Sequence, residues 1–216
     1  NDFLIDLRVL DGSGAGSTSQ VLAAFNWVIT NASLTNIRVV NASLGAPAVD
    51  SYKIDPLCQA TKLLYDQGIV VVASAGNAGL MTDGRTAYGS ISSPGISPWV
   101  ITVGASDDHG TVTRADDTVA SFSSRGPTRA YNDLTQEYDH LIKPELVAPG
   151  HTVVSTMRGT SSLWINYPSK RVKINNVDSE YLKMHGSSMS SAVVSGVVAL
   201  MLQANPNLSP AQVKGI

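Results

Sequence analysis

A serine at the start of a long apolar helix is the side chain best placed for nucleophilic chemistry. Ser188 lies in the segment 186–190 (GSSMS), directly before an apolar stretch that reaches Gln203. The free N–H groups and positive potential of a helix N-terminus can stabilise a negatively charged oxygen as it develops. A serine in this position is also typical of a simple helix N-cap, which is the alternative interpretation.

A second polar side chain follows an expected strand elsewhere in the chain. Asn77 stands in the segment 74–79 (SAGNAG), after the strand 69–73, and small residues also occupy 41–45 (NASLG). Small residues at two adjacent strand ends leave space for a ligand, and the amide of Asn77 would offer a hydrogen-bond donor there. A turn-forming asparagine is the alternative reading of this position.

The segments that carry these residues alternate between strand and helix. Strands are expected at 3–10, 37–44, 69–73, 99–103, 119–122 and 146–148. Helices are expected at 17–29, 55–65, 188–203 and from Ser209 onward, where Pro210 suits the first helical position. This alternation predicts an α/β fold, with a mostly parallel central sheet and helices on both faces. Ligands of such sheets bind at the carboxyl ends of the strands.

Two further regions and both chain ends complete this expectation. The polar regions 127–142 and 158–183 are expected to be surface loops, the second with some hairpin. The chain begins at once with a strand-like segment and ends in a helix that has only begun. We therefore expect residues 1–216 to be one partial domain, truncated at both ends.

The glycine-rich segment 11–17 (DGSGAGS) does not fit a nucleotide site. A dinucleotide fingerprint needs glycine where Ser17 stands and an acidic residue about 20 positions later, and a phosphate-binding P-loop needs a lysine. The glycines leave backbone groups accessible, which suits pairing with an extended peptide. A tight turn is the alternative reading of this segment.

Composition limits the remaining classes of function. The 216 residues carry a net charge of −2, and this near-neutral balance argues against a nucleic-acid partner. The one cysteine, Cys58, cannot form an internal disulfide and has no neighbouring histidine to make it a nucleophile. The longest apolar stretch, 192–202, is shorter than the roughly 18 residues of a membrane helix, so no membrane partner is expected. No spacing of His, Asp and Glu predicts a metal site.

In their order along the chain, these segments resemble the subtilisin-like serine proteases, or subtilases. GSSMS is similar to the nucleophile motif G-T-S-M-A, SAGN to the segment with the oxyanion-hole asparagine, and NASLG to the substrate strand. Further matches are 93–95 (SPG), 100–105 (VITVGA), 120–127 (ASFSSRGP) and 143–150 (KPELVAPG). The resemblance extends over the whole chain and implies a serine endopeptidase that hydrolyses polypeptide substrates.

The resemblance implies a role for each matching residue. Ser188 would be the nucleophile, and Asn77 with the backbone N–H of Ser188 would form the oxyanion hole. The substrate would be bound by Ser43, Leu44 and Gly45, by Ser74, Ala75 and Gly76, and by Gly14, Ala15 and Gly16. The family position of Pro94 predicts a cis Ser93–Pro94 bond. Three residues depart from the motif, since Ser187, Ser190 and Ala192 replace the usual Thr, Ala and Pro.

The Asp and His motifs of the family would precede Phe3 and are not in this sequence. None of His109, His140, His151 and His185 stands in such a motif. The resemblance therefore implies a chain that is inactive alone and needs the missing N-terminal part of its own catalytic domain. The alternative is a non-catalytic peptide-binding pseudoenzyme that retains the substrate groove.

The resemblance also bears on cofactors and location. No cofactor is required by the residues present, although calcium is possible for the full-length domain. A weak cation site could form from carbonyl groups near Gly95, Ser97 and Val100. Most relatives are secreted, which makes an extracellular location the expectation by resemblance.

Overall fold

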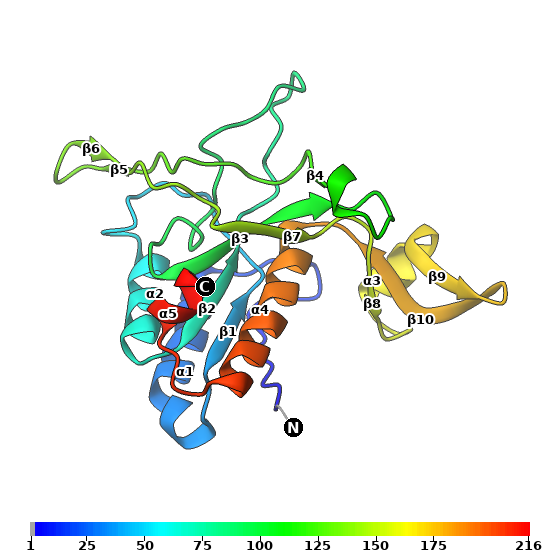
Figure 1. Ribbon diagram of the computed structural model, residues 1–216, viewed down its shortest axis with the longest axis horizontal. Helices are drawn as coiled ribbons and strands as arrows, with labels where there is room; N and C mark the ends of the chain where they lie inside the picture. The colour runs from blue at the N-terminus through cyan, green and yellow to red at the C-terminus, as the bar shows by residue number, and fades with distance from the viewer. Residues whose placement is uncertain (1–2) are drawn as a thin grey trace.

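The computed structural model describes residues 3–216, which build a twisted sheet between two layers of helices (Figure 1). Four parallel strands lie in the order β1 (Val39–Ala42), β2 (Val70–Ser74), β3 (Val100–Asp107) and β7 (Leu146–Pro149). The short β4 (Thr118–Val119) pairs antiparallel with the end of β3. The α/β class and the mostly parallel sheet are confirmed.

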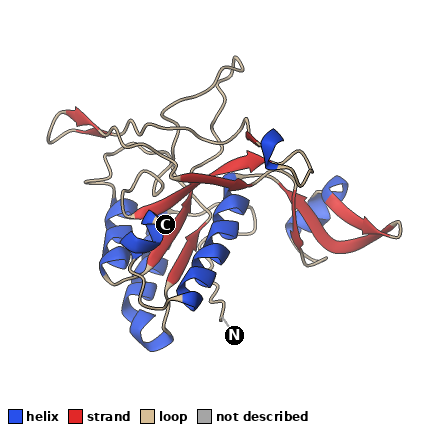
Figure 2. Ribbon diagram, in the orientation of Figure 1, coloured by secondary structure: helices blue, strands red, loops and turns tan. Residues whose placement is uncertain are grey.

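Helices cover both faces of this sheet (Figure 2). The helices α1 (Thr18–Thr35) and α2 (Pro56–Asp66) share one core with Val71 and Ala73 of β2. On the other face, α4 (Ser187–Ala204) and α5 (Pro210–Gly215) pack on Val70 and Val72. Successive side chains of a strand point to opposite faces, so an uninterrupted apolar strand is required between two helical layers.

The helices begin where the sequence provides capping side chains. Ser17 and Ser209 each form a capping box with the glutamine three positions later, and the Asp55 side chain accepts from the N–H of Cys58. These contacts satisfy backbone donors that the first turn of a helix leaves free. The helix starts that the sequence predicts are therefore confirmed to within one residue.

The predicted strand 3–10 is wrong. The segment makes no strand pairing, and Phe3 and Leu4 are almost fully exposed. Leu7 and Val9 nevertheless pack against the α1 side of the core, which accounts for the apolar pattern. A strand requires a hydrogen-bonded neighbour as well as apolar side chains, and β1 pairs only with β2 within residues 3–216.

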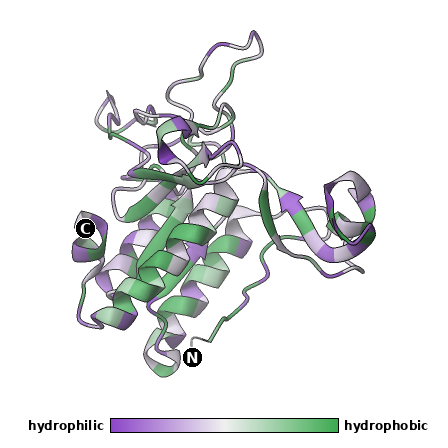
Figure 3. Ribbon diagram, turned by 45° about the vertical axis from the view of Figure 1, so that its right-hand side comes forward, coloured by the Kyte–Doolittle hydropathy of each residue, from purple (hydrophilic) through white to green (hydrophobic). Residues whose placement is uncertain are grey.

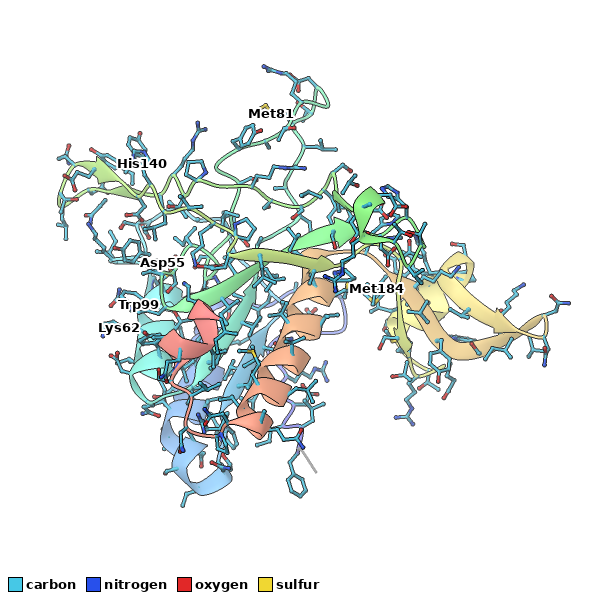
Figure 4. All side chains as sticks on the ribbon, in the orientation of Figure 1. Asp55, Lys62, Met81, Trp99, His140 and Met184 are labelled. Atoms are coloured by element: carbon cyan, nitrogen blue, oxygen red, sulfur yellow. The ribbon has the colours of Figure 1, made fainter. Side chains whose placement is uncertain are left out.

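The region 158–183 is more ordered than a surface loop. It holds α3 (Ser162–Asn166), a 3₁₀ turn (Pro168–Lys170), β9 (Arg171–Ile174) and most of β10 (Val177–Met184). Together with β8 (Val153–Thr156), these strands form a separate antiparallel sheet in the order β8-β10-β9. We call residues 153–184 the arm, and Figure 4 shows it projecting from the body, with Met184 at its base.

The arm owes its hairpin to two consecutive asparagines. Asn175 and Asn176 have φ angles of 52° and 65°, which is the left-handed pair that a type I′ turn needs. In the other region expected to be a loop, 127–142, the two-residue strands β5 (Tyr131–Asn132) and β6 (Glu137–Tyr138) also pair. A 3₁₀ turn (Arg114–Asp116) completes the elements of the described residues.

The helix α4 is longer than the apolar stretch 192–202, whose length was the reason to expect no membrane helix. With 18 residues and a mean hydropathy of 1.4, it is long and apolar enough to cross a membrane by length and composition alone. In the view of Figure 3, apolar residues make up much of the visible side of the helices beside the sheet. Val194, Val198 and Leu202 pack on the sheet, whereas Val193, Val197 and Leu200 are exposed.

Candidate functional site

Ser188 lies in the first turn of α4 and contacts the end of β1. Its Oγ donates to the carbonyl oxygen of Ser43 at 3.1 Å, and the Oγ of Ser43 donates back to the carbonyl of Ser188 at 2.8 Å. Ser188 is half-buried, and the N-cap before it is Gly186, which has no side chain to cover the helix end. These contacts place the candidate nucleophile against the predicted substrate segment 43–45.

Asn77 follows β2 and lies beside the start of α4. Its Oδ1 accepts from the backbone N–H of Ser187 at 2.9 Å. Because a backbone N–H can only donate, the oxygen of the amide must face it, and the Nδ2 group is left to donate elsewhere. Gly186 has a φ angle of 145°, which favours glycine, and a Cβ there would lie in ordinary van der Waals contact with Nδ2, at 3.4 Å.

Ser187 holds the two segments together, a role that the sequence analysis did not assign. Its side chain is fully buried, and its Oγ accepts from the N–H of Gly76 at 3.1 Å. The same Oγ lies 3.1 Å from both Gly76 O and Asn77 Oδ1, to one of which the hydroxyl donates. The sequence held one signal for this role: Ser187 keeps the hydroxyl group of the Thr that the family has at this position.

The predicted substrate-binding segments 43–45 and 74–76 lie next to each other, and the side chain of Ser92, which was not predicted to take part, lies close to both. Ser74 Oγ donates to Leu44 O at 3.3 Å. A Cβ on Gly45 would lie 2.6 Å from Ser92 Oγ, and a Cβ on Gly76 would lie 3.0 Å from the same atom. Ser92 Oγ therefore lies close to both segments. Nearby, the Ser93–Pro94 bond is cis, as the sequence predicts.

The third predicted substrate segment is organised by its own aspartate. Asp11 accepts from the side chain of Ser13 and from the N–H groups of Ser13 and Ala15, which hold the pKa of Asp11 below its usual value. Gly14 has φ +80°, a left-handed turn that suits glycine. Within residues 3–216, no hydrogen bond joins Gly14, Ala15 or Gly16 to Ser188 or Asn77, so the role of this segment in substrate binding stays a prediction.

The histidines of the described chain have partners other than Ser188. His185 Nδ1 accepts from the Thr152 N–H at 3.0 Å, and its Nε2 lies 3.1 Å from Lys170 Nζ. Burial and the charge of Lys170 lower the pKa of His185. His151 Nδ1 pairs with Asp107 at 3.1 Å. Neither ring is hydrogen-bonded to Ser188 Oγ within residues 3–216, where that hydroxyl donates to Ser43 O.

No group of three or more His, Cys, Asp or Glu side chains lies close enough to hold a metal ion within residues 3–216. The oxygens expected to form a weak cation site also have protein donors. The Gly95 carbonyl accepts from Thr102 Oγ1 at 2.6 Å, and the Val100 carbonyl accepts from two lysines. The weak cation site near Gly95, Ser97 and Val100 therefore stays a prediction, at a place where protein donors already bond to two of these carbonyl groups.

Comparisons with known proteins agree with this geometry. The chain is 39% identical to the serine protease AprX of Bacillus subtilis over 98% of its length, and 33% identical to subtilisin DY of Bacillus licheniformis over 99%. It covers 44% and 59% of those two proteins. Among solved structures, Sphericase superposes with a TM-score of 0.68 at 28% identity, over 96% of this chain and 56% of that one.

The chain therefore spans about half the length of the relatives it matches. The model of the Subtilase family matches residues 4–216, which is nearly the whole described sequence. Together with the contact between the Ser187–Ser188 helix start and Asn77, this match establishes that the chain belongs to the subtilase family (Peptidase S8).

Proposed function

We propose that this chain is the serine-bearing part of a serine endopeptidase, with Ser188 as the nucleophile that attacks a peptide carbonyl. The observation that supports it best is the hydrogen bond from the Ser187 N–H to Asn77 Oδ1. Because the amide oxygen accepts that bond, the Nδ2 group of Asn77 would be the atom that donates to an oxyanion beside the helix start. The backbone N–H of Ser188 would supply the second donor.

The substrate would bind as an extended strand. Its backbone would pair with residues 43–45 on one side and with 14–16 on the other, and its P1 side chain would lie between 43–45 and 74–76. Ser92 would limit the depth of that pocket, because both Gly45 and Gly76 face its hydroxyl. Small walls with a serine floor favour P1 side chains without charge.

The general base would come from outside residues 3–216. The Oγ of Ser188 donates to a carbonyl in the described chain, so it lacks a partner that could accept and keep its proton. A preceding segment of the natural protein would supply the Asp and His of the triad, and any calcium site of the whole domain would also lie there. By family membership, we propose an extracellular location.

Labelling with a fluorophosphonate tests this function in the protein at its natural full length. The wild type should be labelled at Ser188 and the Ser188→Ala variant should not. Asn77→Ala should lower kcat by about 10²–10³, the magnitude known for a subtilisin, with little change in KM. Absence of label on the wild type, with retained binding of peptides, would overturn the proposal in favour of a peptide-binding module.

A further inference from the structure

A lysine of the arm and a histidine of the body meet beside the start of α4. Lys170 Nζ lies 3.1 Å from His185 Nε2, and His185 stands three residues before Ser188. Figure 4 labels Met184, the residue directly before this histidine, at the base of the arm. His185 is exposed and Lys170 is half-buried, so both side chains are open to a ligand from solution. The proposed protease chemistry uses neither of them.

The hydrogen atoms of this pair do not match. His185 Nδ1 accepts from the backbone N–H of Thr152 at 3.0 Å. Burial and the charge of Lys170 hold the pKa of His185 below its usual value, so the ring is neutral at pH 7 and its one proton is on Nε2. An ammonium group has donors only. Two donors therefore face each other, and neither can accept from the other.

The described residues supply no acceptor for these two donors. Within residues 3–216, Lys170 forms no ion pair with an Asp or Glu. Asp107 acts on the charge of His185 from nearby, but its carboxylate pairs with His151 at 3.1 Å. The His151 ring packs against that of His185, with 4.7 Å between the centroids. What the pair lacks is an acceptor such as a carboxylate, whose two oxygens can accept from both nitrogen atoms.

The arm fixes the position of Lys170 by contacts that do not use its ammonium group. Lys170 ends the 3₁₀ turn, and the next residue, Arg171, packs over the ring of Trp164 at 3.6 Å. Arg171 also pairs with Asp178 at 2.9 Å. The charge of Arg171 is therefore used inside the arm, whereas that of Lys170 is left for a ligand. A position fixed in advance lowers the entropy lost on binding.

The distribution of charge favours an acidic ligand at the arm. Residues 153–184 carry five Lys and Arg against two Asp and Glu, whereas the whole chain carries 15 against 17. The rest of the chain is therefore acidic, and the positive charge is concentrated in the arm. A positive surface attracts a negatively charged peptide and speeds up its encounter with the protein.

We propose that Lys170 and His185 form a carboxylate-binding subsite for the part of the substrate that follows the scissile bond. This inference rests on the proposed function, in which 43–45 and 74–76 bind the part that precedes the bond. Those segments follow β1 and β2, whereas His185 bonds to Thr152, which follows β7 at the far side of the sheet from β1 (Figure 1). The leaving part of the substrate extends toward the arm. Its first or second residue presents the carboxylate, either of an acidic side chain or of a chain end.

Peptide cleavage by the protein at its natural full length tests this subsite. The peptides share one sequence up to the scissile bond, have amidated C-termini and carry Glu, Gln or Lys at the first or the second position after the bond. The kcat/KM for Glu should exceed that for Gln about 3- to 10-fold, and the preference should weaken in high salt. A further peptide, which carries Gln and ends there with a free carboxylate, distinguishes a chain end from a side chain as the source.

Variants of the arm show whether the preference belongs to this pair. Lys170→Gln should lower the ratio of Glu over Gln to below about 2, and Lys170→Glu should reverse it in favour of the Lys peptide. Lys173→Gln is the matched control, because Lys173 is an exposed lysine of β9 without an ion pair in the part of the chain described. It should keep the wild-type ratio. Equal kcat/KM for the Glu and Gln peptides in the wild type, or an equal loss of preference in Lys173→Gln, would overturn the proposal.

Binding separates this inference from the proposed function. Ser188→Ala cannot use the proposed nucleophile, so fluorescence anisotropy with labelled Glu and Gln peptides gives their Kd values without hydrolysis. A lower Kd for the Glu peptide, lost when Lys170→Gln is added, supports the subsite even if a fluorophosphonate does not label Ser188 in the wild type. Labelling of Ser188 together with equal Kd values for the two peptides refutes the subsite and leaves the proposed function intact.

Discussion

The hydroxyl of Ser187 is the most informative single group to remove, because it links the two halves of the proposed oxyanion hole. Ser187→Ala leaves the half-buried N–H of Gly76 without its acceptor, so the free energy of unfolding should fall by about 0.5–1.5 kcal/mol. Asn77 keeps its bond from the Ser187 backbone N–H and loses only the hydroxyl contact. One hydrogen bond has a net value of about 0.5–1.5 kcal/mol, so kcat should fall about 2- to 10-fold.

The assay is peptide hydrolysis by the natural full-length protein, with kcat and KM determined separately and stability measured in urea. Ser190→Ala is the matched control: this serine is equally buried in the same helical turn but donates to Ala148 O. The control should lose stability and keep its kcat. Ser187→Thr, which retains the hydroxyl, should restore kcat. An unchanged kcat in Ser187→Ala, or an equal fall in Ser190→Ala, would refute the positioning role.

Three further outcomes follow from burial and capping. Cys58 is fully buried and burial raises the pKa of its thiol, so alkylation followed by mass spectrometry should find it modified only after denaturation. Asp55→Ala removes the acceptor that caps α2 and should lower the free energy of unfolding in urea by about 1 kcal/mol; an unchanged midpoint would contradict this. Burial lowers the pKa of Lys143 from 10.5 to about 8, so the unfolded state binds more protons between these pH values. The stability of the wild type relative to Lys143→Met should therefore rise with pH across that window, and a flat or falling difference would count against it.

Features decided by neighbouring residues could be predicted from the sequence. Ser17, Asp55 and Ser209 mark helix starts because each caps backbone groups within three positions. The strand at 70–74 is recognisable because its β-branched run suits burial on both faces. The Asn175-Asn176 pair between two apolar-polar alternations was also a local signal for the hairpin of the arm, and it could have been read from the sequence.

Features decided by distant partners could not be predicted in this way. The segment 3–10 has the residues of a strand, but pairing depends on whether another strand lies beside it. Ser187 and Ser92 matter because of Asn77, Gly45 and Gly76, which are near neighbours only in the folded chain. Lys214 shows the same limit, since the two backbone carbonyl groups to which it donates lie 116 and 114 positions away.

The contact between Ser187 and Asn77 also has a consequence for the order of folding. The two residues are separated by 110 positions, and Ser43 and Ser188 by 145. Loops of this length must close before such contacts can form, and parallel sheets built from distant segments fold slowly for this reason. The candidate site should therefore be assembled among the last events of folding, after α1 and α2 have formed from local contacts. Hydrogen exchange during refolding would detect this as late protection of the N–H groups of Gly76 and Ser187.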